Sequence, residues 1–415
     1  MMNTKKQRVV GIDVARGIAL IGMMAIHILP SYDENFQPTL TWTLLSGVSA
    51  GLFATLAGVS LTFASGGRQP LTGRPLTAAR AALAVRAGFI ISIGLVIAYL
   101  NPPAAIILAY YGVMFLLAIP LLGLGARTLF ALALGFAVIG PVIMQSVLDY
   151  LPALDGYDPT FGTLVTEPVA TASVLLVSGS YPALPWMAYI CAGLALGRLD
   201  LRSYAVQVRI ALGGLALAVG AWLLSAILLG PLGGRSSLLE ATPGVDIEGL
   251  TDIQTFGAKD GLSTSSWWWL AILSPHSSTP LELLHTIGLA AMVLGGVIIL
   301  AGRIGTSLMP LAVMGSMTLT LYSAHLVLLD TRLIAGRPVV WLAVHVILAA
   351  IFAIMWRNVT DGKQGPLERL VAVGANAVRR RVLDKDSSRA TTSAPEGSEL
   401  DEVAPVHRQG ADNRL

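Results

Sequence analysis

Charged side chains are scarce in this 415-residue chain, where Asp, Glu, Lys and Arg together make up 12% of the residues. A soluble protein usually carries about 25%. Here 54% of the residues are hydrophobic, and the mean hydropathy is +0.71. This balance excludes an ordinary water-exposed surface, and it predicts an integral membrane protein. Cysteine is almost absent too, and because Cys191 has no second cysteine to pair with, a disulfide scaffold is excluded.

Several sequence motifs are also missing. There is no HExxH, no cysteine cluster and no spacing of two histidines and a carboxylate on one helix, so we expect no metal site. There is no Walker loop and no GxGxxG between a strand and a helix, which excludes the common nucleotide-binding loops. The formal net charge of +3 is too small to indicate a nucleic-acid partner.

Long apolar runs dominate what is present. A hydrocarbon core about 30 Å thick needs about 20 residues of helix, and ten apolar runs of roughly this kind lie between charged, proline or polar clusters. They centre on Val14–Leu29, Trp42–Ala64, Leu83–Leu100, Ala104–Gly123, Leu129–Val147, Pro182–Leu196, Ile210–Gly230, Leu281–Ala301, Leu308–Leu329 and Val339–Trp356. The sequence therefore predicts an all-α, polytopic membrane protein with about ten transmembrane helices.

The placement of the cations predicts how these helices are oriented. With Lys5, Lys6 and Arg8 in the cytoplasm, all but four of the 27 Lys and Arg residues fall on the cytoplasmic side of the ten spans. This asymmetry follows the positive-inside rule, and it puts both termini in the cytoplasm. The four exceptions are Arg235, Lys259, Arg332 and Arg337.

The chain divides into three predicted parts. Residues 1–366 form the transmembrane domain. Residues 367–383 mix apolar positions with arginines, as expected of an amphipathic helix that lies on anionic lipid. Residues 384–415 are polar and charged, which predicts a disordered cytoplasmic tail.

The first predicted span contains three ionisable residues, Asp13, Arg16 and His27, at a depth where such groups are costly and commonly functional. At about 100° per residue all three share one helix face, and the rise places Arg16 roughly 16 Å from His27. Asp13 and Arg16 can form a simple ion pair at i,i+3. Arg16 can also bind a phosphate on the cytoplasmic side, and His27 can accept and donate protons deeper in the membrane.

More arginines follow in the second predicted connection and at the start of the third span. Arg68, Arg74, Arg80 and Arg86 lie on the same predicted side of the membrane as Arg16. Together these side chains predict a site for an anionic ligand from the cytosol.

The ninth predicted span carries a second polar stripe, in which Thr318, Tyr322 and His325 fall within about 60° of one another. Hydroxyl groups alone are common between membrane helices. A histidine with a tyrosine one turn away can also position or transfer a proton. His345 stands alone in the last span, and we interpret it as structural.

Three further polar residues, His276, Glu282 and His285, surround the start of the eighth predicted span. We expect them at the outer rim of the membrane, where water is available. Solvated or helix-capping roles are the simplest interpretation there.

The segment GIDVARGIALIGMMAIH, residues 11–27, resembles the opening helix of the transmembrane acyltransferase superfamily. The D-x-x-R-G start is shared by these proteins, and the R-x10-H spacing is typical of the polysaccharide O-acyltransferases. Later segments are similar to the bacterial relatives of heparan-α-glucosaminide N-acetyltransferase. These segments are Tyr181–Trp186 with Gly197-Arg198, His276-Ser277, Gly315–Tyr322 and Gly365–Glu368.

The resemblance implies that an acyl group, usually acetyl, passes from cytosolic acyl-CoA to a hydroxyl or amine of a glycan or lipid. The transfer would cross the inner membrane of a bacterium to its outer face. His27 would be the essential histidine and Arg16 the arginine of the first helix. We expect CoA to bind near Arg16, Asp13 and the second-connection arginines, within a central polar tunnel. His325 and Tyr322 would assist His27.

The acceptor would lie on the opposite side of the membrane from CoA. His276, Glu282, His285 and Trp186 are the residues that we expect on the acceptor side.

Two other classes of protein fit parts of this pattern. A proton-coupled transporter or flippase of a lipid or small metabolite would use the same charged stripe and need no CoA. A purely structural membrane partner would leave the buried charges unexplained. Membrane lipid is a partner in every case, and the sequence is compatible with a homo-oligomer.

Overall fold

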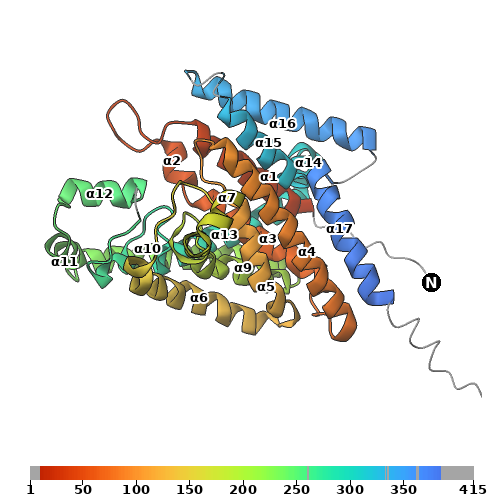
Figure 1. Cartoon of the computed structure of the whole chain (residues 1–415), viewed down its shortest axis with the longest axis horizontal. Coiled ribbons are helices and arrows are strands. Elements are labelled where there is room, and N and C mark those ends of the chain that lie inside the picture. Colours follow the sequence, from red (N-terminus) through yellow and green to blue (C-terminus); the bar gives the residue numbers. More distant parts are fainter. Residues whose placement is uncertain (1–9, 259–260, 332, 334–335, 361–363, 385–415) are drawn as a thin grey trace, which may run out of the picture.

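The computed structural model describes residues 10–258, 261–331, 333, 336–360 and 364–384 (Figure 1). Most of these residues lie in helices. The β-type backbone pairing among them is one isolated bridge between Tyr32 and Pro38. The predicted all-α fold is therefore confirmed. The cations at positions 5, 6 and 8 and the predicted tail beyond Asp384 lie outside the described residues.

The helices follow one another with mostly short connections. The α-helices are α1 (Val10–Ile28), α2 (Leu40–Leu45), α3 (Val48–Ala64), α4 (Gly73–Ile97), α5 (Leu108–Ala118), α6 (Ala126–Val147), α7 (Phe161–Thr166), α8 (Pro168–Ser173), α9 (Ala183–Gly197), α10 (Tyr204–Leu229), α11 (Gly234–Ala241), α12 (Ile247–Phe256), α13 (Pro280–Ile304), α14 (Met309–Gly315), α15 (Thr318–Asp330), α16 (Pro338–Thr360) and α17 (Pro366–Asp384). Short 3-10 turns are η1 (Ala98–Leu100), η2 (Ile119–Gly123), η3 (Leu148–Tyr150) and η5 (Trp267–Ala271), and η4 (Val174–Ser178) is a π-helical turn.

Every predicted apolar run overlaps apolar helical segments, and some runs are divided between two of them. Among the described residues, seven helical segments are long and apolar enough to cross a membrane: α1, α2 with α3, α4, α6, α10, α13 and α16. Two bent pairs, α8–η4 with α9 and α14 with α15, raise the number to nine, and α5 with η2 is shorter. The protein is therefore a multi-pass membrane protein by the length and composition of its helices. The count of ten and the cytoplasmic termini stay predictions.

The ninth span differs from the single run that the sequence predicts over Leu308–Leu329. It is broken into α14 and α15, which meet at 81° around Ser316 and Met317. Just before the break, α14 packs very closely on α1. A Cβ on Gly315 would overlap the backbone carbonyl of Asp13 there. α15 consequently begins inside the protein with backbone N–H groups that need new acceptors.

Four helices, α1, α3, α9 and α13, form the centre of the molecule. Every residue of α9 except Leu184 is buried, and α9 packs closely on α3, where a Cβ on Gly193 would overlap the carbonyl of Thr55. In contrast, α6, α10 and α16 lie at the periphery and expose large apolar side chains. Examples are Ile139, Trp222 and Ile351. Large apolar surfaces of this kind suit a lipid environment rather than water.

The C-terminal helix α17 packs lengthwise against α4 (Figure 1). It covers the segment 367–383 that the sequence predicts as an amphipathic helix, and its outer face exposes Leu370 and Val373. Its inner face contacts both α4 and α15. α17 is therefore part of the packed helical body, and its contact with lipid stays a prediction.

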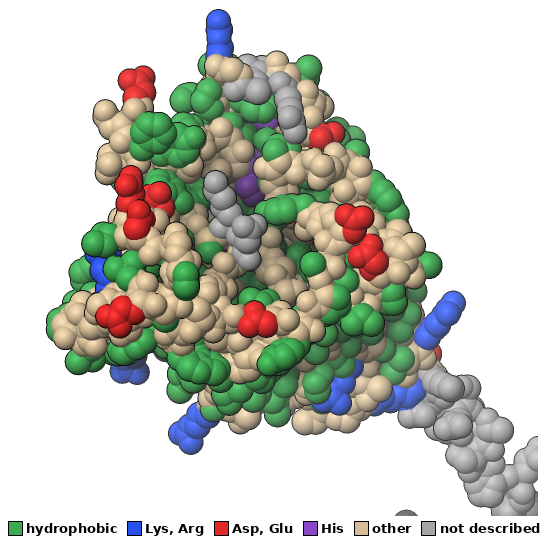
Figure 2. Space-filling model, turned by 60° about the vertical axis from the view of Figure 1, so that its left-hand side comes forward, with side chains coloured by type: hydrophobic (Ala, Val, Ile, Leu, Met, Phe, Trp, Pro, Cys, Tyr) green, Lys and Arg blue, Asp and Glu red, His purple; other side chains and the backbone are tan. Residues whose placement is uncertain are grey.

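Charge is distributed unevenly over the surface. Figure 2 shows acidic side chains gathered over one face, with Lys and Arg side chains concentrated along its lower edge. The same view shows histidine side chains set back between the helices of the acidic face. The separation agrees in direction with the predicted orientation, although which end faces the cytoplasm stays a prediction.

Candidate functional site

A large cavity of about 1500 Å³ lies between α1, α3, α4, α5, the α14–α15 break and α17. Pockets for drug-sized ligands are commonly about 300–1,000 Å³, so this cavity can hold a larger molecule. Arginines predominate among its charged lining residues. These are Asp13, Arg16, Arg68, Arg86, Arg198, Asp200, Arg202, Glu368 and Arg379. Such a lining favours an anionic ligand.

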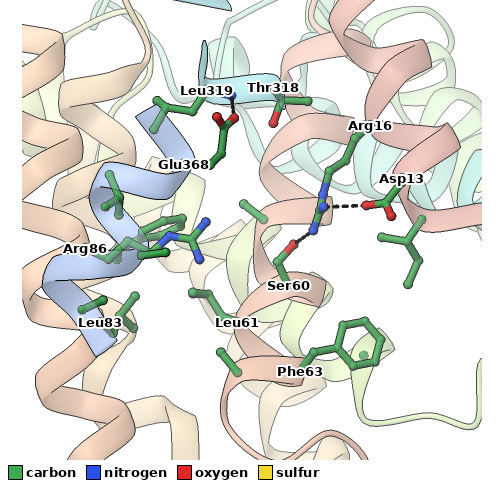
Figure 3. A pocket seen from close by; sticks show the side chains of 18 of the residues that line it. Asp13, Arg16, Ser60, Leu61, Phe63, Leu83, Arg86, Thr318, Leu319 and Glu368 are labelled. Atoms are coloured by element: carbon green, nitrogen blue, oxygen red, sulfur yellow. Dashed lines mark hydrogen bonds and ion pairs between the residues drawn. The ribbon is translucent and has the colours of Figure 1, made fainter. Parts of the chain in front are cut away.

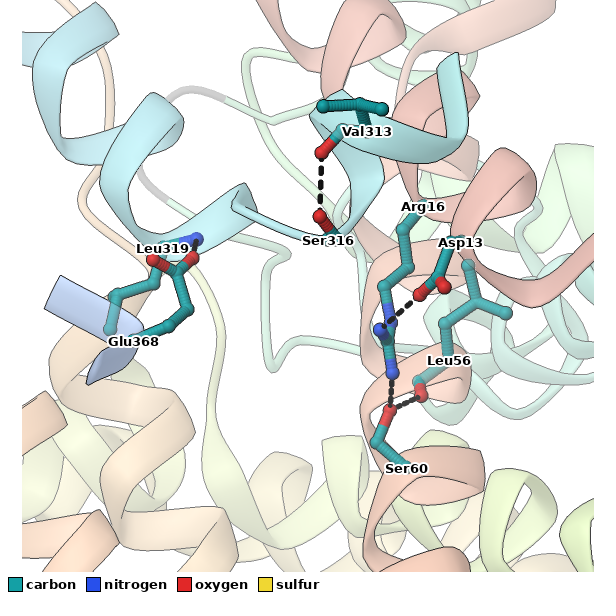
Figure 4. A network of polar contacts seen from close by, with 8 residues as sticks. All are labelled: Asp13, Arg16, Leu56, Ser60, Val313, Ser316, Leu319 and Glu368. Atoms are coloured by element: carbon teal, nitrogen blue, oxygen red, sulfur yellow. Dashed lines mark hydrogen bonds and ion pairs between the residues drawn. The ribbon is translucent and has the colours of Figure 1, made fainter. Parts of the chain in front are cut away.

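Arg16 is held on the cavity wall by partners on both sides (Figure 4). Its Nη1 lies 2.9 Å from Oδ1 of Asp13, and its Nη2 donates to the hydroxyl of Ser60 on α3. Ser60 in turn donates to the carbonyl oxygen of Leu56 at 2.6 Å. The predicted ion pair is therefore present. It fixes the direction of the guanidinium while the Arg16 side chain keeps 20% of its surface exposed.

Arg86 approaches the same space from α4. Figure 3 shows its guanidinium and that of Arg16 on opposite sides of the cavity, both turned toward the space between them. The Arg86 Cζ lies 5.7 Å from the centre of the Phe115 ring, and its buried Nε has no hydrogen-bond partner among the described residues. Two cations that face each other across a partly buried cavity disfavour one another, and an anion between them would relieve this repulsion.

The other predicted arginines separate into two groups. Arg68 lines the cavity and forms an exposed ion pair with Asp200 at 2.9 Å. Arg74 and Arg80 do not line it. Arg74 donates to the carbonyl of Val382 at 2.8 and 2.7 Å, and Arg80 donates to the carbonyls of Ile119 and Pro120. Both therefore fasten neighbouring backbone segments to α4.

Three lining arginines, Arg198, Arg202 and Arg379, are absent from the predicted site. Arg198 is buried and donates to backbone carbonyls, among them Leu124, so it also joins helix ends. The sequence offers their predicted cytoplasmic side as a signal, and for Arg198 also its place in a segment that resembles the family. Neither signal distinguishes a cation on the cavity wall from one in solvent.

Glu368 is a further lining residue that the sequence leaves unassigned. From α17 it accepts hydrogen bonds from the N–H groups of Leu319 and Thr320, at 2.7 and 3.2 Å, and from the Thr320 hydroxyl at 2.6 Å. These are the groups exposed by the break before α15 (Figure 4). Glu368 therefore fixes the start of the helix that carries Tyr322 and His325.

His27 and His325 are brought together from α1 and α15. Nδ1 of His27 lies 3.1 Å from Nε2 of His325, and the two rings are nearly parallel at 9°. Neither ring lines the cavity, whereas Met23 and Tyr322, each about one helical turn before a histidine, do. The cavity in the described structure therefore ends about one turn from the histidines, and the predicted central polar tunnel stays a prediction.

Tyr322 lies on the cavity wall with its hydroxyl occupied by the connection before α5. The hydroxyl accepts the N–H of Ile107 at 3.5 Å and donates to the carbonyl of Ala105 at 3.4 Å. Both contacts are long, so the hydroxyl is weakly held. Tyr322 and His325 thus share a helix, but the Tyr322 hydroxyl contacts the connection before α5 and not the His325 ring.

The predicted acceptor-side residues are only partly brought together. Trp186 donates to the Ser278 hydroxyl at 3.1 Å, and Ser278 lies two residues after His276 in the same connection. Glu282 is buried, with 4% of its surface exposed, although we expected it at a wet rim. His285 faces away, with Nδ1 3.0 Å from the carbonyl of Ala218 on α10.

Glu282 is buried because neighbouring hydroxyls replace water. Its Oε1 accepts hydrogen bonds from Tyr189 and Thr286, each at 3.1 Å. Its Oε2 has no partner among the described residues. Among those same residues, no three His, Cys, Asp or Glu side chains are grouped so as to hold a metal ion.

The family model described as heparan-alpha-glucosaminide N-acetyltransferase, catalytic, matches residues 8–226, slightly more than half of the chain. No curated protein matches the chain. The matched segment contains Asp13, Arg16, His27 and Arg86, and it ends within α10, before the helices that carry His325 and Glu368. With this match over more than half of the chain, including Arg16, Arg86 and the first histidine, the chain belongs to the heparan-alpha-glucosaminide N-acetyltransferase catalytic family and is an acyltransferase-type membrane enzyme.

Proposed function

We propose that the protein transfers an acetyl group from acetyl-CoA to a hydroxyl or amine of a glycan or lipid across a bacterial inner membrane. The observation that carries this proposal is the position of the cavity. Arg16 and Arg86 line one part of the cavity. Its opposite part stops about one helical turn from His27 and His325.

The arginine end suits the phosphates of CoA. Arginine binds phosphate through a planar fork of donors, and such charge-assisted hydrogen bonds are stronger than neutral ones. Arg16 and Arg86 face each other there, while Arg68 and Arg379 also line the cavity. The volume of about 1500 Å³ leaves room for the nucleotide and for the chain that carries the thioester.

The histidine end suits the chemistry of acyl transfer. As the acceptor oxygen or nitrogen attacks the thioester carbonyl, a neutral imidazole of His27 takes its proton. A new bond to the carbonyl carbon forms, the C–S bond breaks, and the CoA thiolate leaves and takes the proton back. The same imidazole can instead carry the acetyl group as a covalent intermediate.

The orientation follows from the charges. If the arginine end faces the cytosol, acetyl-CoA enters where it is made, and the acceptor meets the histidines from the opposite side. This orientation is the one that the positive-inside rule predicts. Membrane lipid surrounds the helices, and either a lipid or a membrane-linked glycan can deliver the acceptor group.

The test is transfer of labelled acetyl from acetyl-CoA into the lipid and glycan fractions of membranes that contain the protein. We expect His27→Gln and Arg16→Gln each to reduce transfer, and Arg80→Gln, whose side chain does not line the cavity, to serve as the matched control. If both variants transfer at the wild-type rate, the proposal is wrong.

A second measurement separates this proposal from a transporter. Binding of CoA to the folded protein should raise the thermal unfolding midpoint, because a ligand stabilises the state that it binds. No stabilisation at millimolar CoA, together with substrate accumulation that collapses with the proton gradient, would instead indicate a transporter.

A further inference from the structure

Three histidines from three helices form a row in the structure. His27 on α1 contacts His325 on α15 through a 3.1 Å nitrogen pair. The centre of the His325 ring lies 4.9 Å from that of His345 on α16, at an interplanar angle of 74°. His345 is 2% exposed and His325 is also 2% exposed. The lone, structural histidine that the sequence predicts is thus in contact with the proposed catalytic pair.

The far end of this row has a defined hydrogen-bond direction. Nδ1 of His345 lies 2.9 Å from the carbonyl oxygen of Trp341, one turn earlier on α16. A carbonyl oxygen can only accept, so Nδ1 of His345 carries the hydrogen. In the neutral ring, Nε2 is then an acceptor.

The middle of the row contains two unsatisfied nitrogens that complement each other. Nε2 of His345 and Nδ1 of His325 are both buried and have no hydrogen-bond partner among the described residues. A neutral His325 that accepts from His27 through Nε2 must carry its hydrogen on Nδ1. It then offers a donor toward the ring that carries the His345 acceptor, whose centre is 4.9 Å away, and one bridging water can join the two nitrogens without breaking either outer contact.

We propose that His345 is a positioning residue that fixes the protonation pattern of the whole row. Hydrogens would lie on Nδ1 of His345, His325 and His27 in turn, so that Nε2 of His27 keeps its lone pair as the basic atom. This inference rests on the proposed function, because it names which atom of His27 takes the acceptor proton.

The same row can move that proton away from the reacting groups. When Nε2 of His27 gains the acceptor proton, its Nδ1 hydrogen passes to Nε2 of His325, and the Nδ1 hydrogen of His325 passes to Nε2 of His345. One positive charge then resides on His345, beside the Trp341 carbonyl and the Trp341 ring, whose centre is 4.3 Å away. An aromatic ring and a carbonyl both stabilise such a cation. The steps reverse when the CoA thiolate takes the proton.

The first test compares two variants at one position. His345→Phe keeps a ring but removes both nitrogens, whereas His345→Gln keeps an oxygen that can accept a hydrogen bond. We expect His345→Phe to lower kcat by about 10- to 100-fold, as loss of a residue that orients a catalytic group commonly does, with an unchanged KM for acetyl-CoA. We expect His345→Gln to recover the part of that loss that comes from orienting His325, while the part that needs a proton acceptor at position 345 stays lost. Equal losses in both variants would overturn the positioning role.

The second test reads the hydrogens directly and does not depend on activity. Nitrogen NMR of histidine-labelled protein distinguishes hydrogen on Nδ1 from hydrogen on Nε2, and single substitutions assign the signals. We expect His27 with its hydrogen on Nδ1, a mixture of the two forms in His345→Phe, and no change in His285→Phe, which also removes a histidine bonded to a carbonyl.

Negative results of the two tests overturn different hypotheses. Hydrogen on Nε2 of His27 in the wild-type protein overturns the inference, whatever the enzyme activity. The predicted pattern in a protein that transfers no acetyl group from any acyl-CoA would instead overturn the proposed function and leave the hydrogen-bonded row in place.

Discussion

The two ends of helix α1 have opposite surroundings. Around Arg16 the structure is open, with a wide cavity and several cations on its wall. Around His27 the molecule is closed to this cavity, because the histidine rings contact one another and do not line it, although His27 itself is partly exposed. One helix thus joins a place that suits binding to a place that suits proton transfer, separated by a rise of roughly 16 Å.

This difference predicts how the kinetic parameters divide. Substitutions at the open end should weaken binding of the thioester substrate and act mainly on KM. Substitutions at the closed end should remove stabilisation that exists only in the transition state and act mainly on kcat. Variants that change both parameters equally at both ends would abolish the distinction.

The largest effect is expected at the closed end. His27→Gln removes the proposed base and should lower kcat by about 10²- to 10⁴-fold, with the KM for acetyl-CoA within about twofold of the wild type. Initial rates over a range of acetyl-CoA concentrations measure both parameters. An unchanged kcat would remove His27 from the chemistry, and a large rise in KM would assign it to binding.

The next effect is expected at the open end. Arg86→Gln should raise the KM for acetyl-CoA by about 10- to 100-fold, because a hydrogen bond to a charged group contributes about 1.5–3 kcal/mol. Arg80→Gln, six residues earlier on α4, is the control, since Arg80 donates to the carbonyls of Ile119 and Pro120. Calorimetric binding of CoA should reproduce the same order. Equal effects of the two substitutions would contradict the assignment of Arg86.

The sequence predicts the contents of α1 well, because a single helix fixes the relative positions of its residues. Asp13, Arg16 and His27 share a face by helical geometry alone, and the Asp13–Arg16 pair is present as expected. The apolar runs are also predicted, since hydrophobic length is a strong signal for membrane helices.

Contacts between helices are much harder to predict. The break before α15 depends on Gly315 against the backbone of Asp13, and its cap comes from Glu368 on another helix. His345 is interpreted as structural because nothing on its own helix shows that α15 brings His325 to it. The burial of Glu282 likewise depends on hydroxyls from α9 and α13.

The contact between α1 and α14 lies at the Arg16 end of α1, next to the break before α15, and it gives a third prediction. Gly315→Ala forces a Cβ against the Asp13 carbonyl and should destabilise the fold by about 1–3 kcal/mol, as overpacking commonly does. Gly88→Ala on α4, where a Cβ meets no atom within 4 Å, is the control. Thermal unfolding in detergent measures both. Equal midpoints would show that α14 can shift without cost.

The closed end is also fastened from the connection between α6 and α7. Asp158 accepts the N–H of Ile106 through both carboxylate oxygens, at 3.2 and 3.3 Å, next to the segment that Tyr322 contacts. Burial raises the pKa of Asp158 from 3.8 to about 6, although the hydrogen bond from Ile106 acts in the opposite direction.

The smallest effect follows from this pKa. Because the folded protein holds the Asp158 proton more tightly than the unfolded chain, this residue contributes most to stability below about pH 4, and the contribution is lost as the pH rises to about 6. After allowance for the partial exposure of the side chain, we expect a loss of about 1 kcal/mol. Asp158→Asn cannot ionise, so its unfolding midpoint should fall less between pH 4 and pH 7 than that of the wild type. If the two proteins show the same pH dependence, Asp158 ionises in the folded protein as freely as in water, and the closed end is wetter than its contacts indicate.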